Sequence, residues 1–163
     1  MHLTIRKAYL QDTQDVSAIL SEAAWYLVSI GQTLWNSVEL SPEHIAHDVE
    51  NGEYYIAYLN GEPVGTFRYQ LEDQVYWPDI TDGKSAFIHR LAIRRKAASS
   101  GITKQMLDWA KEHTRKIRRD YLRLDCAERP KLCTFYENNG FNKHSERDVG
   151  SLHVVRYECR VRT

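Results

Sequence analysis

The 163-residue chain has no long apolar run, no excess of either charge and few cysteines. No segment has the roughly 18 consecutive apolar residues that a membrane-spanning helix needs. Lysine plus arginine number 22 and aspartate plus glutamate number 22, so no overall field attracts the chain to nucleic acid or an anionic membrane. The N-terminal MHLTIRKAYL alternates like a strand and lacks the apolar centre of a signal peptide. These absences argue against nucleic-acid and membrane partners and favour a cytoplasmic location.

The three cysteines, Cys126, Cys133 and Cys159, are an odd number without metal-ligand spacing, and this pattern predicts reduced thiols packed in a core. There is no Walker-type Gly-Lys-Ser/Thr loop and no recognisable context for a Ser-His-Asp triad. His44 and His47 stand three apart on an expected helix without a third ligand. We therefore expect neither a metal site nor cysteine or serine nucleophile chemistry.

The hydrophobic content of 42% supports one sizeable core, and the length predicts a single domain over residues 1–163. Asp12 is a favourable N-cap, Pro42 suits a first helical turn, and Asn60-Gly61 is a strong hairpin signal. The expected helices cover about residues 12–30, 42–51, 101–117 and 130–138. The expected strands cover about residues 2–8, 53–59, 63–71, 86–94, 121–126, 142–147 and 152–161. This order predicts an α/β (α+β) fold with a mixed sheet flanked by helices.

The stretch from Ala86 to Ala110 predicts an anion site. An apolar strand runs into a turn of basic and small residues, and the turn opens an amphipathic helix. The first N–H groups of a helix have no partner within it and lie at the positive end of its dipole. Such a turn is a natural seat for a phosphate group, although many strand–turn–helix units share the pattern.

Four segments together resemble the GNAT superfamily of N-acetyltransferases over essentially the whole chain. They are HRLAI (His89–Ile93), SSGITKQMLDWA (from Ser99), LRLDC (Leu122–Cys126) and FYENNGF (Phe135–Phe141). The last is the most specific, because Phe-Tyr-Glu followed shortly by Gly-Phe is a recurrent closing signature of the superfamily.

The resemblance implies a centrally splayed sheet of about seven strands flanked by about four helices, with acetyl-CoA as cosubstrate in the central gap. The pantetheine would pair with backbone groups of Leu91, Ala92 and Ile93. The pyrophosphate would rest on the turn formed by Ala98, Ser99, Ser100, Gly101, Ile102 and Thr103.

Three positions depart from the family pattern. The usual turn has Arg or Gln first and Gly or Ala last, where this chain has Ala98 and Thr103. Arg129 stands where an asparagine would help to hold the pantetheine. The hydroxyls of Ser99 and Ser100 and the charges of residues 94–96 offer replacements. These departures support an alternative, a non-catalytic GNAT-fold module that binds CoA or another protein.

The resemblance implies that Tyr136 acts as general acid to the CoA thiolate, whereas the alternative is a tyrosine packed in the core. His89 on the central strand is a candidate general base, since the pKa of histidine suits proton removal near neutrality. A structural histidine is equally compatible, and Glu128 and Asp125 are alternative bases. A backbone N–H near Leu91 would stabilise the oxyanion.

An acceptor pocket is expected among the first two helices, the hairpin and the loop before the central strand. Trp25, Trp35 and Trp77 are candidate substrate-binding residues, and Trp77 in particular is expected to be exposed because its loop is polar. Four acids near this region could pair with a cationic amine, but we expect their side chains to be solvated: Glu22, Glu72, Asp73 and Asp79.

The sequence thus predicts transfer of an acetyl group from acetyl-CoA to a primary amine of a small molecule or peptide. An enzyme using another acyl-CoA fits equally well. The acceptor itself is not specified, because the fold is shared by enzymes with many substrates. A homodimer is compatible with the residues, and none of them requires it.

Overall fold

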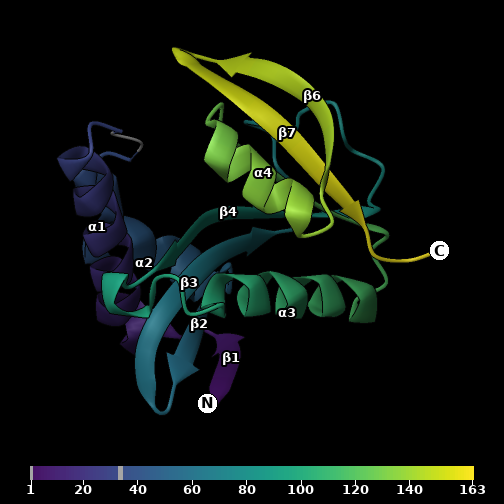
Figure 1. The fold of residues 1–163 in the computed structure, drawn as a ribbon. Helices are drawn as coiled ribbons and strands as arrows, with labels where there is room; N and C mark the ends of the chain where they lie inside the picture. Colours follow the sequence, from purple (N-terminus) through teal and green to yellow (C-terminus); the bar gives the residue numbers. More distant parts are fainter. Residues whose placement is uncertain (1, 33–34) are drawn as a thin grey trace. The chain divides into compact units, whose positions relative to one another are not determined.

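The computed structural model describes residues 2–32 and 35–163 (Figure 1). The strands are β1 (Leu3–Lys7), β2 (Tyr54–Leu59), β3 (Glu62–Gln70), β4 (Ser85–Ile93), β5 (Tyr121–Ala127), β6 (Asn142–Val149) and β7 (Leu152–Arg160). The α-helices are α1 (Thr13–Ser29), α2 (Pro42–Glu50), α3 (Ile102–Lys116) and α4 (Pro130–Asn138). In these described residues, hydrogen bonding gives one seven-stranded sheet in the order β1-β2-β3-β4-β5-β7-β6. The predicted mixed α/β fold is confirmed. Among the same residues, no helix is long and apolar enough to cross a membrane.

The chain divides into two compact units. The first contains the residues up to Arg68 together with Arg90–Met106, and the second contains Tyr69–His89 together with Leu107–Thr163. Strands β3 and β4 and helix α3 each contribute residues to both units. The expectation of a single domain stays a prediction.

In the first unit, the β2–β3 hairpin follows the sequence prediction closely. Asn60 and Gly61 have φ of 51° and 86°, the left-handed pair that a tight two-residue hairpin turn requires. Strand β1 pairs antiparallel with β2. Helices α1 and α2 pack their apolar faces with these strands in one buried cluster, which includes Val16, Ile19, Leu20, Ile45, Val49, Tyr54 and Ile56.

Asp12 is the N-cap residue of α1, as predicted, but its side chain forms no capping hydrogen bond. Its carboxylate is buried and forms an ion pair with Arg6 at 2.7 Å. It also accepts the backbone N–H of Tyr9 at 2.8 Å, which closes the short 3₁₀ turn before the helix. Because Arg6 and the N–H of Tyr9 bind the Asp12 carboxylate, that carboxylate accepts no N–H group from the first turn of α1, which begins at Thr13.

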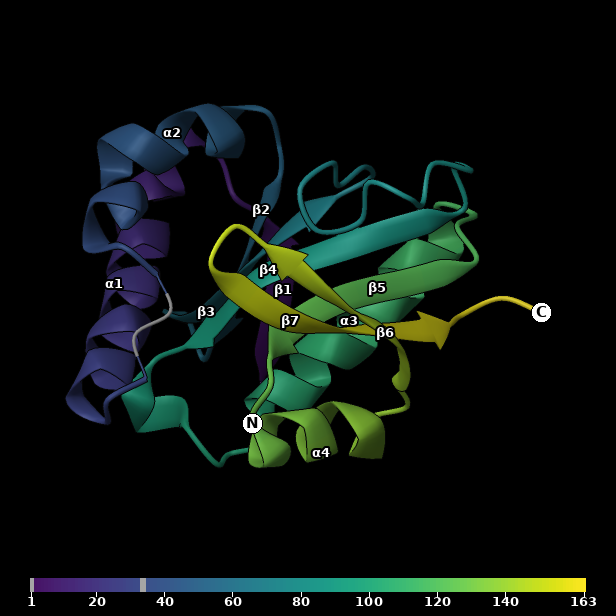
Figure 2. The same cartoon turned by 90° about the horizontal axis from the view of Figure 1, so that it is seen from above.

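In the second unit, β5 pairs antiparallel with β7 along Tyr121–Ala127 and β7 pairs with β6 as a hairpin. Helix α4 packs against β5 and β6 (Figures 1 and 2). Strand β4 pairs in parallel with β5 only over Ser85–Ile88. The parallel pairing therefore ends one residue before His89.

Trp77 is fully buried, so the prediction that it lies exposed for a substrate is wrong. Its ring lies 6.0 Å from Phe87 and 5.2 Å from His144. The guanidinium groups of Arg123 and Arg156 lie 5.2 and 4.5 Å from the ring centre. Cation–π attraction and apolar packing bury this indole although the surrounding loop is polar.

Candidate active site

The turn between β4 and α3 has the form of an anion-binding loop. A 3₁₀ turn, Arg95–Ala97, is followed by a short segment in which Ser99 and Gly101 have φ of 63° and 83°. Left-handed residues directly before a helix direct successive backbone N–H groups to one concave face. Ser99 and Gly101 are exposed, whereas Ile102 is fully buried and fixes the start of α3. The geometry fits the phosphate seat predicted from the sequence.

Two features set the backbone of this turn. The Ser100 hydroxyl donates to the carbonyl of Ala97, so it stabilises the turn and does not point outward as a phosphate donor. The N–H of Gln105 donates to the carbonyl of Gly101 at 3.2 Å, which is the first helical bond of α3. The N–H groups of Ile102 and Thr103, in the first helical turn, precede any intrahelical acceptor.

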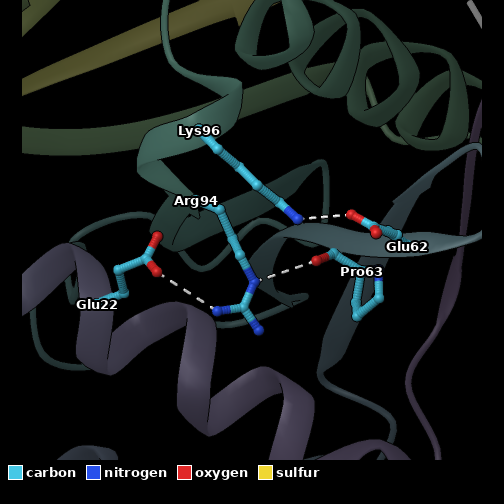
Figure 3. A pocket seen from close by; sticks show the side chains of 5 residues that line it. All are labelled: Glu22, Glu62, Pro63, Arg94 and Lys96. Carbon is cyan, nitrogen blue, oxygen red and sulfur yellow. Dashed lines mark hydrogen bonds and ion pairs between the residues drawn. The ribbon is translucent and has the colours of Figure 1, made fainter.

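The basic residues before the turn are paired within the first unit. Arg94 donates from Nε to the carbonyl of Pro63 at 3.2 Å, and its Nη1 lies 3.5 Å from Glu22 (Figure 3). Lys96 forms an ion pair with Glu62 at 2.5 Å. Figure 3 shows that these five side chains line one pocket. Each of these two cations therefore has a carboxylate partner, and the role of their charges beside the turn stays a prediction.

Glu22 has a further contact that ties the turn to α1. Its second carboxylate oxygen accepts the backbone N–H of Arg95 at 2.8 Å. The Arg95 guanidinium stacks over the ring of Tyr26 at 3.6 Å. Glu22 is therefore a positioning residue for the turn and not the solvated charge that the sequence favoured.

In the second unit, His89 lies between the buried carboxylate of Asp73 and the partly buried carboxylate of Asp125. Its Nε2 is 2.7 Å from Asp73 Oδ2, and its Nδ1 is 3.6 Å from Asp125 Oδ2. Asp73 comes from the β3–β4 loop and Asp125 from β5. The two ring nitrogens face different acids, an arrangement that suits proton transfer. One ligand atom from each of the three residues lies within 4.8 Å of the others, so the group is also close enough to hold a metal ion.

Asp73 fixes the protonation pattern of the imidazole. Its Oδ1 accepts the backbone N–H groups of Val75 and Tyr76 at 3.0 and 2.9 Å. Burial acts to raise the pKa of Asp73, but the hydrogen bonds from His89 and these N–H groups outweigh it and lower the pKa. Because Asp73 is ionised, it favours a proton on Nε2 of His89. Sequence spacing gave no sign of this pair, since the loop fold brings the two residues together.

Asp125 behaves in the opposite way. Burial, aided by the charge of Asp73, raises the pKa of Asp125 to about 6, although His89 opposes the rise. The carboxyl group beside Nδ1 therefore changes its charge just below neutral pH. Asp125 and His89, the two bases that the sequence offered as alternatives, form one coupled unit.

The raised pKa of Asp125 predicts an unusual pH dependence of stability. The folded state holds this proton more tightly than the unfolded chain, so the contribution is present below pH 4 and is lost as pH rises through 6. The free energy of unfolding of Asp125→Asn minus that of the wild type should increase by up to about 3 kcal/mol from pH 4 to pH 7.5. Urea unfolding at both pH values measures this difference.

Asp12→Asn is the matched control, because Asp12 is buried and its hydrogen bond with Arg6 lowers the pKa. Its contribution has the opposite sign, so this variant should lose stability relative to the wild type as pH rises from 3 to 6. A difference between Asp125→Asn and the wild type that is constant with pH would contradict the assignment.

Tyr136 is buried on α4. Its ring packs against Phe135, Phe141 and Tyr157 at 5.5, 5.9 and 6.2 Å between ring centres. Burial raises the pKa of its phenol, so the hydroxyl is protonated at neutral pH and can donate. Burial likewise raises the pKa of the nearby Cys126 thiol to about 12, so this thiol is protonated at neutral pH.

Comparison with known proteins identifies the family. Residues 20–141, about three quarters of the chain, match the model of the Acetyltransferase (GNAT) family. The chain belongs to the GNAT acetyltransferase family. This GNAT chain is 25% identical over 159 residues to the uncharacterized N-acetyltransferase YesJ of Bacillus subtilis (strain 168), covering 93% of this chain and 87% of YesJ.

Solved structures confirm the GNAT fold. A GNAT acetyltransferase from Listeria monocytogenes 4b F2365 has a TM-score of 0.82 at 21% identity, covering 97% of this chain and 94% of the other. The aminoglycoside acetyltransferase AAC(6')-Ib, solved in complex with coenzyme A and kanamycin, has a TM-score of 0.78 at 17% identity, covering 98% and 95%. At these identities the likeness establishes the fold of this GNAT chain and not its substrate.

The remaining residues predicted for the GNAT site differ in exposure. Leu91 and Ile93 are half-buried, and Ala92 is part of the core cluster. Arg129 is the N-cap residue of α4, and its N–H donates to the carbonyl of Ala127. Trp25 is 75% exposed on α1, whereas Trp35 packs half-buried against the core cluster. The binding roles of these residues stay predictions.

Proposed function

We propose that this GNAT chain is an acetyl-CoA-dependent N-acetyltransferase whose acceptor is a primary amine of a small molecule or peptide. The observation that carries the proposal is the contact of His89 with Asp73 and Asp125, because it supplies an oriented base in a GNAT fold. The relative that binds coenzyme A and kanamycin supports the same cosubstrate and an amine acceptor.

The turn before α3 would hold the cosubstrate. Backbone N–H groups from Ser99 to Thr103 would bind the pyrophosphate, with the positive end of the helix adding attraction. The left-handed residues Ser99 and Gly101 keep this backbone in the required form although Ala98 and Thr103 differ from the family pattern. Backbone groups of residues 91–93 and Arg129 would contact the pantetheine.

The chemistry is direct attack of the amine on the thioester carbonyl. His89 Nδ1, coupled to Asp125, takes the proton from the amine as the C–N bond forms. A backbone N–H at Leu91 stabilises the oxyanion. The C–S bond then breaks, and Tyr136 gives its phenolic proton to the CoA thiolate. His89 releases the amine proton to solvent, and Tyr136 regains a proton from solvent before the next turnover. The products are the N-acetylated amine and CoA.

The first test of the proposal is at Gly101. A Cβ atom there would meet nothing within 4 Å, so Gly101→Ala changes only the strained backbone and the space open to a phosphate. We expect its Kd for acetyl-CoA, measured by calorimetry, to rise by about 10-fold or more, since a methyl group blocks close approach to the N–H groups.

Gly61→Ala is the matched control, because Gly61 has a φ of 86° and its Cβ would also meet nothing within 4 Å. Both variants carry the same backbone strain, so both should lose similar stability, and only Gly101→Ala should lose affinity. Equal acetyl-CoA affinity in the two variants would contradict the placement of the phosphate. Tight binding without acetyl transfer to any amine would favour the non-catalytic module.

A further inference from the structure

Arg90 has a backbone conformation that strands rarely contain. Its φ is 52°, in the left-handed region, although it lies within β4 directly after His89. A long side chain seldom adopts this conformation, and such residues gather where function requires an unusual orientation. The conformation redirects the side chain that follows the proposed base.

The guanidinium of Arg90 is anchored on one side and loosely paired on the other. Its Nη1 donates to the hydroxyl of Tyr54 at 3.0 Å, and Tyr54 is fully buried. Its Nη2 lies 3.7 Å from Oε2 of Glu39, whose side chain is 59% exposed. Among the described residues, these are the polar contacts of the group. A distance of 3.7 Å is an ion pair without a good hydrogen bond.

Arg68, in the same unit, is an arginine whose guanidinium is paired with carboxylates. It donates from Nε and Nη2 to Glu53 at 3.3 and 2.8 Å, and its Nη2 lies 3.2 Å from Asp48. Two carboxylates thus occupy its fork. Arg90 instead has one exposed acid, Glu39 on the short 3₁₀ turn Ser37–Leu40, beside its Nη2. Asp48 acts on it only through its charge, so a ligand can displace Glu39 from the guanidinium.

We propose that Arg90 binds a carboxylate of the acceptor, so that the substrate is an amino acid or a small amine bearing a carboxylate. A guanidinium fork matches a carboxylate with two parallel hydrogen bonds, and the Tyr54 contact holds it in place. Arg90 directly follows His89, the proposed base, in the sequence of β4. This inference rests on the proposed N-acetyltransferase function.

The test compares acceptors that differ only in the carboxylate. The twenty common amino acids and their carboxamides are incubated separately with the enzyme and acetyl-CoA, and N-acetylated products are quantified by mass spectrometry. The wild type should acetylate the best acid with a kcat/KM at least about 10-fold above that of its amide. Arg90→Asn should reduce this ratio toward one, because asparagine tolerates the left-handed backbone but lacks the guanidinium.

Two further variants separate recognition from structure. Arg90→Lys keeps the charge but loses the fork, so its acid-to-amide ratio should lie between those of the wild type and Arg90→Asn. Glu39→Gln removes the competing carboxylate and should lower the KM for the acid. A merely structural arginine would move the melting temperature and leave the ratio and this KM unchanged.

The outcomes separate the carboxylate site at Arg90 from the N-acetyltransferase function. Equal use of acids and amides by the wild type overturns the carboxylate site and leaves the N-acetyltransferase proposal standing. An unchanged ratio in Arg90→Asn assigns the preference to another residue and also overturns it. Failure to acetylate any member of either set, by protein that binds acetyl-CoA, counts against the proposed function itself.

Discussion

Replacement of Tyr136 by phenylalanine is expected to lower kcat for acetyl transfer by about 100-fold or more, while the Kd for acetyl-CoA stays close to that of the wild type. Loss of a general acid typically costs a factor of this size. The ring of the variant keeps its packing against Phe141 and Tyr157. The structure shows no hydrogen bond from the Tyr136 hydroxyl to another described residue, so the melting temperature should change little. Steady-state kinetics with calorimetry measures both constants.

Tyr157→Phe is the control for this experiment. The two rings are neighbours, and the Tyr157 hydroxyl donates to Oε2 of Glu137 at 2.8 Å. This variant should lose some stability and keep its kcat, since a hydrogen bond to a charged group is worth about 1.5–3 kcal/mol. If both variants keep full turnover, the assignment of Tyr136 as the acid is wrong.

The second large effect is expected at His89. His89→Gln should lower kcat/KM by about 100-fold near neutral pH, because glutamine cannot take the proton from the amine. The deficit should shrink toward pH 10, where about half of an acceptor amine with a pKa of about 10 is already neutral in solution. A pH series of kcat/KM for both proteins measures this convergence.

Asp73→Asn tests the same base through its partner. An amide at this position can donate to Nε2 of His89 and so favour the wrong tautomer, with the proton on Nδ1. We expect a smaller loss of kcat/KM with the same convergence at high pH. A deficit in His89→Gln that is equal at every pH would indicate a structural role for His89.

The elements of the fold were predictable because local chemistry determines them. The Asn60-Gly61 turn, the proline at the start of α2 and that at the start of α4 act within a few residues of themselves. The turn between β4 and α3 was also predictable, since small residues followed by an amphipathic helix mark a strand–turn–helix unit.

The sequence-based predictions that failed share one physical cause: side chains far apart in the sequence pair in the folded protein. Trp77 lies in a polar loop, and the guanidinium groups of Arg123 and Arg156 bury it. Asp12 has the residue type of an N-cap, and Arg6 draws its carboxylate elsewhere. The pairing of Asp73 with His89 and the left-handed φ of Arg90 have no local signal at all.

The most direct test of the central claim is amine-dependent release of CoA from acetyl-CoA, followed with a thiol-reactive dye and matched to N-acetylated product by mass spectrometry. The account predicts CoA release that requires an amine, equals the product formed, and is largely lost in Tyr136→Phe and His89→Gln. CoA release that is independent of amine, or that is unaffected in both variants, would contradict it.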